Sequence, residues 1–167
     1  MGRFRPHVIF SAAITLDGKL ATRTGDSKLS SKADKNRVHK LRGKVDAILI
    51  GKNTAKLDDP LLSVHHAKKK NPIRVVLDSN ATIQNNSRIL RTSSKIPTII
   101  VVGQKAHKKN LRRLEKFPIQ VIVCGNQRIN IKKLIGILAK QGITVSYTHL
   151  RAHETRHDLV CRLLLEK

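Results

Sequence analysis

One stretch decides the fold that the sequence predicts, residues 15–65, TLDGKLATRTGDSKLSSKADKNRVHKLRGKVDAILIGKNTAKLDDPLLSVH. Within it, residues 45–50 are apolar apart from Asp46, which predicts a strand covered on both faces. An apolar, β-branched run at 8–14 predicts another buried strand, which ends before the Asp-Gly turn at 17–18. Two covered strands on either side of a helical pattern favour an α/β protein.

The segment between these two strands has the signals of one helix. Ser30 or Ser31 can cap its start, and Asp34 in the first turn complements the positive end of the helix dipole. Apolar residues recur at helical spacing across 38–41, and Gly43 marks the end. We therefore predict a helix that runs from about residue 31 to Gly43.

A polar segment, residues 52–60, follows the strand at 45–50. It contains Thr54 and Asp58 and ends in a proline-fixed turn at Pro60. We interpret it as a polar turn at a strand end, which is where α/β proteins place ligands. A solvated loop without a site is the alternative interpretation of the same residues.

Several sequence blocks together resemble a known family. They are DGKLA at 17–21, VHKLR at 38–42, VDAILIG at 45–51, LDDPLLSVH at 57–65 and NPIRVVLDS at 71–79. In this order they are similar to the pyrimidine reductase family of riboflavin biosynthesis. The resemblance implies an α/β fold like that of dihydrofolate reductase, with a mixed, mostly parallel sheet flanked by helices. It also implies NADPH-dependent reduction of the ribosyl group of a pyrimidine ribosylamino 5′-phosphate to a ribityl chain.

No deaminase domain precedes the matching blocks, so the chain resembles the stand-alone archaeal and fungal type more than the bacterial fused enzyme. That type acts on the 2,5-diamino pyrimidinone before deamination. The sequence leaves open whether the substrate is aminated or deaminated. The resemblance also implies a homodimer when the protein is complete.

The resemblance also assigns candidate site residues. Those that match the family's cofactor positions are Thr54, Asp58, Val76, Leu77, Asp78 and Ser79. Those that match its substrate positions are Ser27, Arg42, Leu62 and His65. A guanidinium such as that of Arg42 can hold a phosphate through two parallel hydrogen bonds, although a cation is also favoured at a helix end without any ligand. Hydride transfer is the cofactor's chemistry, so we expect the protein to align the reactants, with no catalytic side chain, metal or covalent nucleophile.

The alternation of strands and helices continues after the matched blocks. Further strands are predicted at 73–78, 98–102 and 119–124 and from Ile143 onward. Further helices are predicted around 111–117, with a basic amphipathic pattern, and from Asn130 to Gly142. The pattern predicts one α/β domain without repeats.

The pattern changes at Ser146. The family continues with a glutamate and a glycine-rich turn that receives the cofactor's phosphates, whereas this chain has SYTHLRAHETRHDLVCRLLLEK and no glycine after Gly142. That string closely resembles a translated sequencing-adapter read-through. We therefore expect residues 1–145 to be an incomplete reductase domain and residues 146–167 to be a non-native tail.

The tail admits a metal-binding alternative. His149, His153 and His157 are four residues apart and would lie on one face of a helix with Asp158 nearby, which suits zinc or nickel. A solvated helix or a sequencing artefact explains the same residues without a site. We therefore predict no metal.

The charge of the chain supports a different class of function. Thirty-four Lys and Arg against 11 Asp and Glu give a net charge of +23, which attracts anions. The basic clusters 68–70 and 105–113 would suit a nucleic-acid-binding α/β domain without enzymatic activity. Against that alternative, aromatic residues make up only 2% of the chain and offer few stacking platforms.

Two cysteines, Cys124 and Cys161, are too few for a disulfide framework. This favours a reducing, cytoplasmic location. The sequence contains no signal-peptide pattern and no apolar run long enough to span a membrane, so we expect no membrane association.

Overall fold

The structure, a computed structural model of the chain, describes residues 6–11, 31–64, 71–143 and 145–149. Strands and helices alternate along them in the order β1 (His7–Ser11), α1 (Lys32–Arg42), β2 (Ala47–Gly51), α2 (Lys52–Asp58), β3 (Ile73–Leu77), α3 (Arg88–Arg91), β4 (Thr98–Val102), α4 (Lys108–Leu114), β5 (Gln120–Val123), α5 (Ile131–Lys140) and β6 (Val145–His149). The predicted α/β class is confirmed. None of the described helices is long and apolar enough to cross a membrane.

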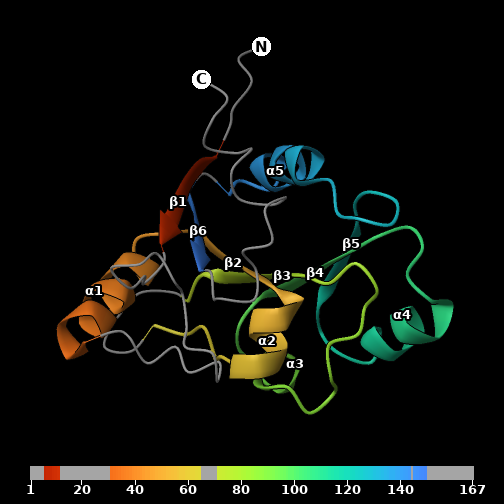
Figure 1. Cartoon of the computed structure of the whole chain (residues 1–167), viewed down its shortest axis with the longest axis horizontal. Helices are drawn as coiled ribbons and strands as arrows, with labels where there is room; N and C mark the ends of the chain where they lie inside the picture. The colour runs from red at the N-terminus through yellow and green to blue at the C-terminus, as the bar shows by residue number, and fades with distance from the viewer. Residues whose placement is uncertain (1–5, 12–30, 65–70, 144, 150–167) are drawn as a thin grey trace, which may run out of the picture.

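The strands form a six-stranded sheet in the order β1-β6-β2-β3-β4-β5 (Figure 1). Every described pair of neighbouring strands is parallel, whereas the prediction allowed a mixed sheet. The register brings the ends of adjacent strands to within one residue of each other, with Gly51 opposite Leu77 and Leu77 opposite Val101, the residue before the end of β4. The segments that leave these strands therefore start side by side at one edge of the sheet.

The predicted strand at Ile143 begins at Val145 and is longer than expected. This strand, β6, lies inside the sheet and pairs with both β1 and β2. It includes residues 146–149, the first four residues of the segment that we predicted to be a non-native tail. Residues 150–167 lie outside the described part, so the predicted boundary at Val145 stays a prediction.

The core is divided between the two faces of the sheet. On one face, buried residues of β2, β3 and β4 pack with apolar side chains of α1, α3 and α4. On the other face, alternate residues of the same strands pack against α5. This division follows from the side-chain alternation of strands, and Figure 1 shows α5 on the side of the sheet opposite to α3 and α4.

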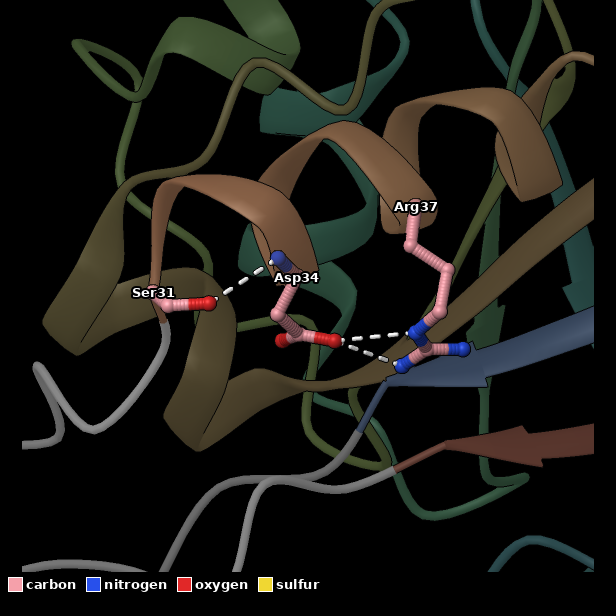
Figure 2. A network of polar contacts seen from close by, with 3 residues as sticks. All are labelled: Ser31, Asp34 and Arg37. Carbon is pink, nitrogen blue, oxygen red and sulfur yellow. Dashed lines mark hydrogen bonds and ion pairs between the residues drawn. The ribbon is translucent and has the colours of Figure 1, made fainter.

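Helix α1 has the ends that the sequence predicts. The Ser31 hydroxyl accepts a hydrogen bond from the Asp34 amide at 3.2 Å, and Gly43 is the C-cap. Arg37 lies one turn beyond Asp34, and its guanidinium pairs with the Asp34 carboxylate at 2.8 Å (Figure 2). The hydroxyl cap fixes where α1 begins, whereas an exposed ion pair of this kind adds little stability.

Helix α5 also begins and ends as predicted. The Asn130 side chain accepts from the Lys133 amide at 2.9 Å. At the other end Gly142 has a φ of +78° and donates to the Ala139 carbonyl, and Ile143 donates to the Leu138 carbonyl. This pair of bonds is a Schellman motif, which requires the left-handed backbone that glycine adopts without strain.

Two local predictions were wrong, and one helix was missed. The polar turn expected over 52–60 is largely helix α2, whose N-cap is Gly51 and whose C-cap Asp59 is left-handed. Seven residues are too few to show a helical period, and Gly51 makes no side-chain cap that the sequence could signal. Helix α3 was not predicted, and α4 ends before Phe117.

Candidate active site

Helix α2 carries two of the predicted cofactor residues. It leaves β2 without an intervening loop and also contacts β3. Thr54 is buried and Asp58 is partly buried. Because they are four residues apart, both side chains lie on the same face of α2.

The end of β3 carries the other four predicted cofactor residues. Val76 and Asp78 are buried, whereas Leu77 and Ser79 are partly exposed. The Asp78 carboxylate accepts hydrogen bonds from the amides of Thr82 and Ile83, the latter at 2.7 Å. Asp78 therefore shapes the β3–α3 loop, which we define as residues 78–87.

The strand ends after β3 and β4 approach each other closely. The Ser79 carbonyl accepts from the Gly103 amide at 3.0 Å. A Cβ on Gly103 would collide with the Asn126 carbonyl oxygen in the segment after β5, so only glycine fits at this position. Ser79 follows the end of β3, and β2 and β3 end side by side, so Ser79 lies at the same edge of the sheet as α2.

A cavity of about 390 Å³ lies between α2 and the β3–α3 loop. Most of its lining residues have polar side chains, with two lysines and one aspartate among them, and the full set is Lys52, Asn53, Ala55, Lys56, Asp59, Thr82, Ile83, Gln84, Asn86 and Ser87. Thr54 and Asp58 are not among these residues, because they lie on the opposite face of α2. The predicted cofactor residues and this cavity therefore occupy two sides of the same helix.

Sequence reasoning missed Lys52 and Lys56 as part of the site. In a chain with a net charge of +23, two more lysines carry no signal of their own. Their position next to the cavity follows from α2 being a helix, which the sequence did not predict.

The predicted substrate residues are only partly described. Arg42 is the last residue of α1 and is partly buried, and Leu62 is buried with a φ of +53°. Ser27 and His65 lie outside the described residues. The structure therefore brings the cofactor residues to one edge of the sheet but does not test the substrate set as a whole.

Arg74 on β3 is a buried arginine that the sequence did not single out. Its side chain is fully buried. Its guanidinium donates to the carbonyls of Ile89 at 2.9 Å and Ile96 at 3.1 Å and to the Thr98 hydroxyl at 2.7 Å. Burial lowers the pKa of Arg74 to about 10, so the group is still protonated at neutral pH.

Arg74 also holds the turn that contains Leu62. Its Nη1 donates to the Leu61 carbonyl at 3.3 Å and to the Thr92 hydroxyl at 2.8 Å. We define the α2 turn as residues 59–64, and its other bonds are Arg88 N–H to the Asp59 carboxylate at 2.7 Å and Val64 N–H to the Asn71 amide oxygen at 3.0 Å. A core arginine thus fixes a segment at the edge of the site.

The candidate metal ligands of the sequence and the cysteine Cys124 complete the comparison with the structure. Among the described residues, no group of three His, Cys, Asp or Glu is placed to hold a metal ion, and His153, His157 and Asp158 lie outside them. Cys124 is buried, and its thiol contacts the Asn130 carbonyl at 3.2 Å. This contact is consistent with a structural role for Cys124.

A parallel sheet with helices on both faces and polar side chains beyond adjacent strand ends defines the class of α/β proteins that place ligands at that edge. Within this class, the chain belongs to the RibD C-terminal domain family, whose model matches residues 6–149.

Among curated proteins, the chain is similar to the 2,5-diamino-6-ribosylamino-4(3H)-pyrimidinone 5′-phosphate reductases of Methanothermobacter thermautotrophicus and Aquifex aeolicus. It is 43% identical to the first over 142 residues and 35% identical to the second over 144 residues. Each match covers 83% of this chain and 64% of the relative. The riboflavin biosynthesis protein RibD of Bacillus amyloliquefaciens is 35% identical over 144 residues, with 85% of this chain and 38% of that protein covered.

Solved structures share the fold. A pyrimidine reductase-like protein of Corynebacterium diphtheriae superposes with a TM-score of 0.74 at 19% identity, over 87% of this chain and 65% of that chain. A deaminase/reductase of Thermotoga maritima superposes with a TM-score of 0.71 at 23% identity, over 87% of this chain and 39% of that chain. The predicted fold and family are confirmed.

Proposed function

We propose that this chain forms the greater part of an NADPH-dependent reductase of riboflavin biosynthesis. The reaction is reduction of the ribosyl group of a pyrimidine ribosylamino 5′-phosphate to ribityl. The observation that carries the proposal is the meeting of α2, with Thr54 and Asp58, and the β3 end, with Asp78 and Ser79, at one edge of the sheet. The 43% identity to an archaeal reductase supports it.

The side chains at this edge fit an anionic dinucleotide. Lys52 and Lys56 offer cations, and Asn53, Thr82 and Gln84 offer uncharged donors around the same cavity. Phosphates are held by such combinations of ammonium groups and neutral donors. Thr54, Asp58 and Ser79 would hold the part of the cofactor that lies on the other side of α2.

When bound, NADPH supplies the hydride. The work left to the chain is positioning, which can lower a barrier by several kcal/mol when the reacting atoms are held about 3 to 3.5 Å apart. Thr54 offers a hydroxyl on a buried side chain of α2, which suits that task. No side chain needs to form a covalent intermediate.

On the substrate side, we propose that Arg42 and Ser27 hold the phosphate or sugar and that Leu62 and His65 border the substrate. Arg42 is supported by its place at the end of α1, where a guanidinium can present a bidentate fork. The names of the archaeal and Aquifex relatives support the aminated pyrimidine as the substrate.

We further propose a cytoplasmic homodimer, and a native sequence that differs from this one after Val145. Reading the gene again across the codon for Val145 tests the second point. The comparisons do not support the alternative of a nucleic-acid-binding domain.

The proposal is tested by NADPH binding and by turnover. We expect the chain to bind NADPH in a fluorescence titration and to bind it more weakly after Thr54→Val or Asp58→Asn. Arg112→Gln is the matched control, because Arg112 is exposed on α4 and remote in sequence from every proposed site residue. Equal binding by all variants would contradict the assignment of Thr54 and Asp58.

Turnover is followed as loss of NADPH absorbance with the aminated and the deaminated pyrimidine in parallel. We expect weak or no turnover by the 167-residue chain and clear turnover by a protein with the family's glycine-rich segment restored after Val145. Robust turnover by the chain as it stands would contradict the predicted incompleteness.

A further inference from the structure

Helix α4 is joined to the β3–α3 loop by three side-chain hydrogen bonds. Asn110 Nδ2 donates to the Asn80 carbonyl at 2.9 Å. Arg113 donates through Nη2 to the Ala81 carbonyl at 2.8 Å and through Nη1 to the Asn85 amide oxygen at 2.5 Å. The partners are about 30 residues apart in sequence, so these bonds determine where the loop lies relative to α4.

The bonds from α4 hold other atoms of the loop than the Asp78 carboxylate does. The Asp78 carboxylate holds the amides of Thr82 and Ile83, whereas Arg113 holds carbonyl and amide oxygens on either side of them. Ala81, which accepts from Arg113, has a φ of +55°, a conformation that alanine adopts only when its surroundings impose it. The loop conformation therefore depends on both sets of bonds.

The same loop forms one side of the cavity beside α2. Five of its residues line that cavity, namely Thr82, Ile83, Gln84, Asn86 and Ser87, and no residue of α4 does. Asp59 joins the two sides by accepting from the Arg88 amide, which follows the loop. The width of the cavity thus depends on bonds made by a helix that does not contact its interior.

We propose that Asn110 and Arg113 are positioning residues that hold the β3–α3 loop as one wall of the cofactor cavity, so that α4 sets the affinity for NADPH. This inference rests on the proposed function, because that function places the cofactor at this edge. Neither residue touches the cavity, so their effect is transmitted through the loop.

Arg113→Gln and Asn110→Ala test the proposal against Arg112→Gln. Arg112→Gln removes the same charge from the adjacent position of α4, so it corrects for the loss of long-range attraction between the helix and an anion. We expect Arg113→Gln to weaken NADPH binding about fivefold in a fluorescence titration. This factor corresponds to the net free energy of roughly one hydrogen bond that stabilises the loop. Arg113→Lys should also bind NADPH more weakly, because an ammonium group cannot make both bonds of the guanidinium fork.

Hydrogen exchange provides a readout that does not depend on the cofactor. The amides of Thr82 and Ile83 should exchange faster in Arg113→Gln and in Asn110→Ala than in Arg112→Gln, while core amides of β3 and β4 keep their protection. In a protein that turns over, the KM for NADPH should rise while the KM for the pyrimidine stays the same. A thermal melt for each variant separates loop loosening from loss of the fold.

The outcomes separate the two proposals. If neither the unsubstituted chain nor a protein with the family's glycine-rich segment restored after Val145 binds NADPH, the proposed function fails and this inference fails with it. If the chain binds NADPH and the Arg113 and Arg112 variants lose equal affinity with equal exchange at Thr82 and Ile83, only the positioning role is overturned.

Discussion

The α2 turn (residues 59–64) and the β3–α3 loop (residues 78–87) lie at the same edge of the sheet but are fixed in different ways. The α2 turn is held from inside, by the buried guanidinium of Arg74 on the Leu61 carbonyl. The β3–α3 loop is held by the Asp78 carboxylate and, on its other side, by partly exposed α4 residues. Both segments contain non-glycine residues with positive φ.

Because of this difference, mutations in the supports of the α2 turn and of the β3–α3 loop should have different effects on stability. A change in the support of the α2 turn alters the core, because Arg74 also bonds to the segments around α3 and to β4. A change in the outer support of the β3–α3 loop acts on partly exposed side chains of α4 and removes no side chain from the core. Substrate binding should therefore be tied to global stability, whereas cofactor affinity can change without it.

The largest expected effect is that of Arg74→Met. The substitution leaves the carbonyls of Leu61 and Ile89 without the guanidinium donor, and a buried carbonyl without a donor costs about 1 to 3 kcal/mol. The Ile96 carbonyl loses one donor but keeps its bond from the Thr98 hydroxyl. Removal of a buried charge offsets part of this cost. We expect the free energy of unfolding to fall by about 4 kcal/mol, measured by urea denaturation.

Two controls make the Arg74 result specific. Thr92→Val removes one partner of the guanidinium and should cost about 1 kcal/mol. Burial lowers the pKa of Arg74 from its ordinary value to about 10, so the unfolded state binds more protons than the folded state only above about pH 10. The stability lost through this charge burial is therefore regained only as pH rises above about 10. The difference in free energy of unfolding between wild type and Arg74→Met should stay constant from about pH 6 to about pH 9. A difference that changes steeply within that range would contradict the assignment.

The next largest effect is expected at Leu62 in the α2 turn. Its side chain is 2% exposed, so Leu62→Ala should lower the free energy of unfolding by about 3 kcal/mol. Its φ of +53° gives a sharper test, since glycine adopts this conformation without strain. Leu62→Gly should therefore be at least as stable as Leu62→Ala, whereas glycine is usually the less stable of the two. A glycine variant that is clearly less stable than the alanine variant would contradict the left-handed geometry.

A smaller effect is expected for Asp78→Asn in the β3–α3 loop. Both amides donate to the same oxygen, Oδ2, and an asparagine oxygen in its place is a neutral and therefore weaker acceptor for them. The NH₂ group would face the Thr82 hydroxyl, which now donates to Oδ1. We expect a loss of about 1 kcal/mol in the free energy of unfolding and faster exchange of the Ile83 amide. If Asp78→Asn left the exchange of that amide unchanged, the inner support of the loop would not be the one described.

The sequence predicted the local parts of this structure well, because their signals lie within a few residues. Ser31 and Asn130 begin helices through bonds to amides three residues later, and the Gly142 cap is equally local. The apolar runs at β3 and β4 predicted strands within a residue of their bounds.

The supports of the site could not be predicted in the same way. Arg74 bonds to groups 13 to 24 residues away, and Arg113 to groups 28 to 32 residues away, so no spacing in the sequence signals either network. Thr54 and Asp58 were found through resemblance alone, and the helix that carries them was predicted as a turn. The positions of candidate ligands were thus easier to predict than the residues that hold them in place.

The smallest expected effect is that of Ala81→Gly, and it tests whether the β3–α3 loop is strained. Ala81 is buried with a φ of +55°, so glycine relieves about 1 kcal/mol of left-handed strain while it loses a buried methyl group and increases the freedom of the unfolded chain. These terms oppose each other, and we expect a change of less than about 0.5 kcal/mol. Ala106→Gly is the matched control, because Ala106 is buried nearby without a positive φ and should lose about 1 kcal/mol. An equal loss in both variants would mean that the loop stores no strain at Ala81, and the bond from Arg113 would then hold a conformation that the loop already prefers.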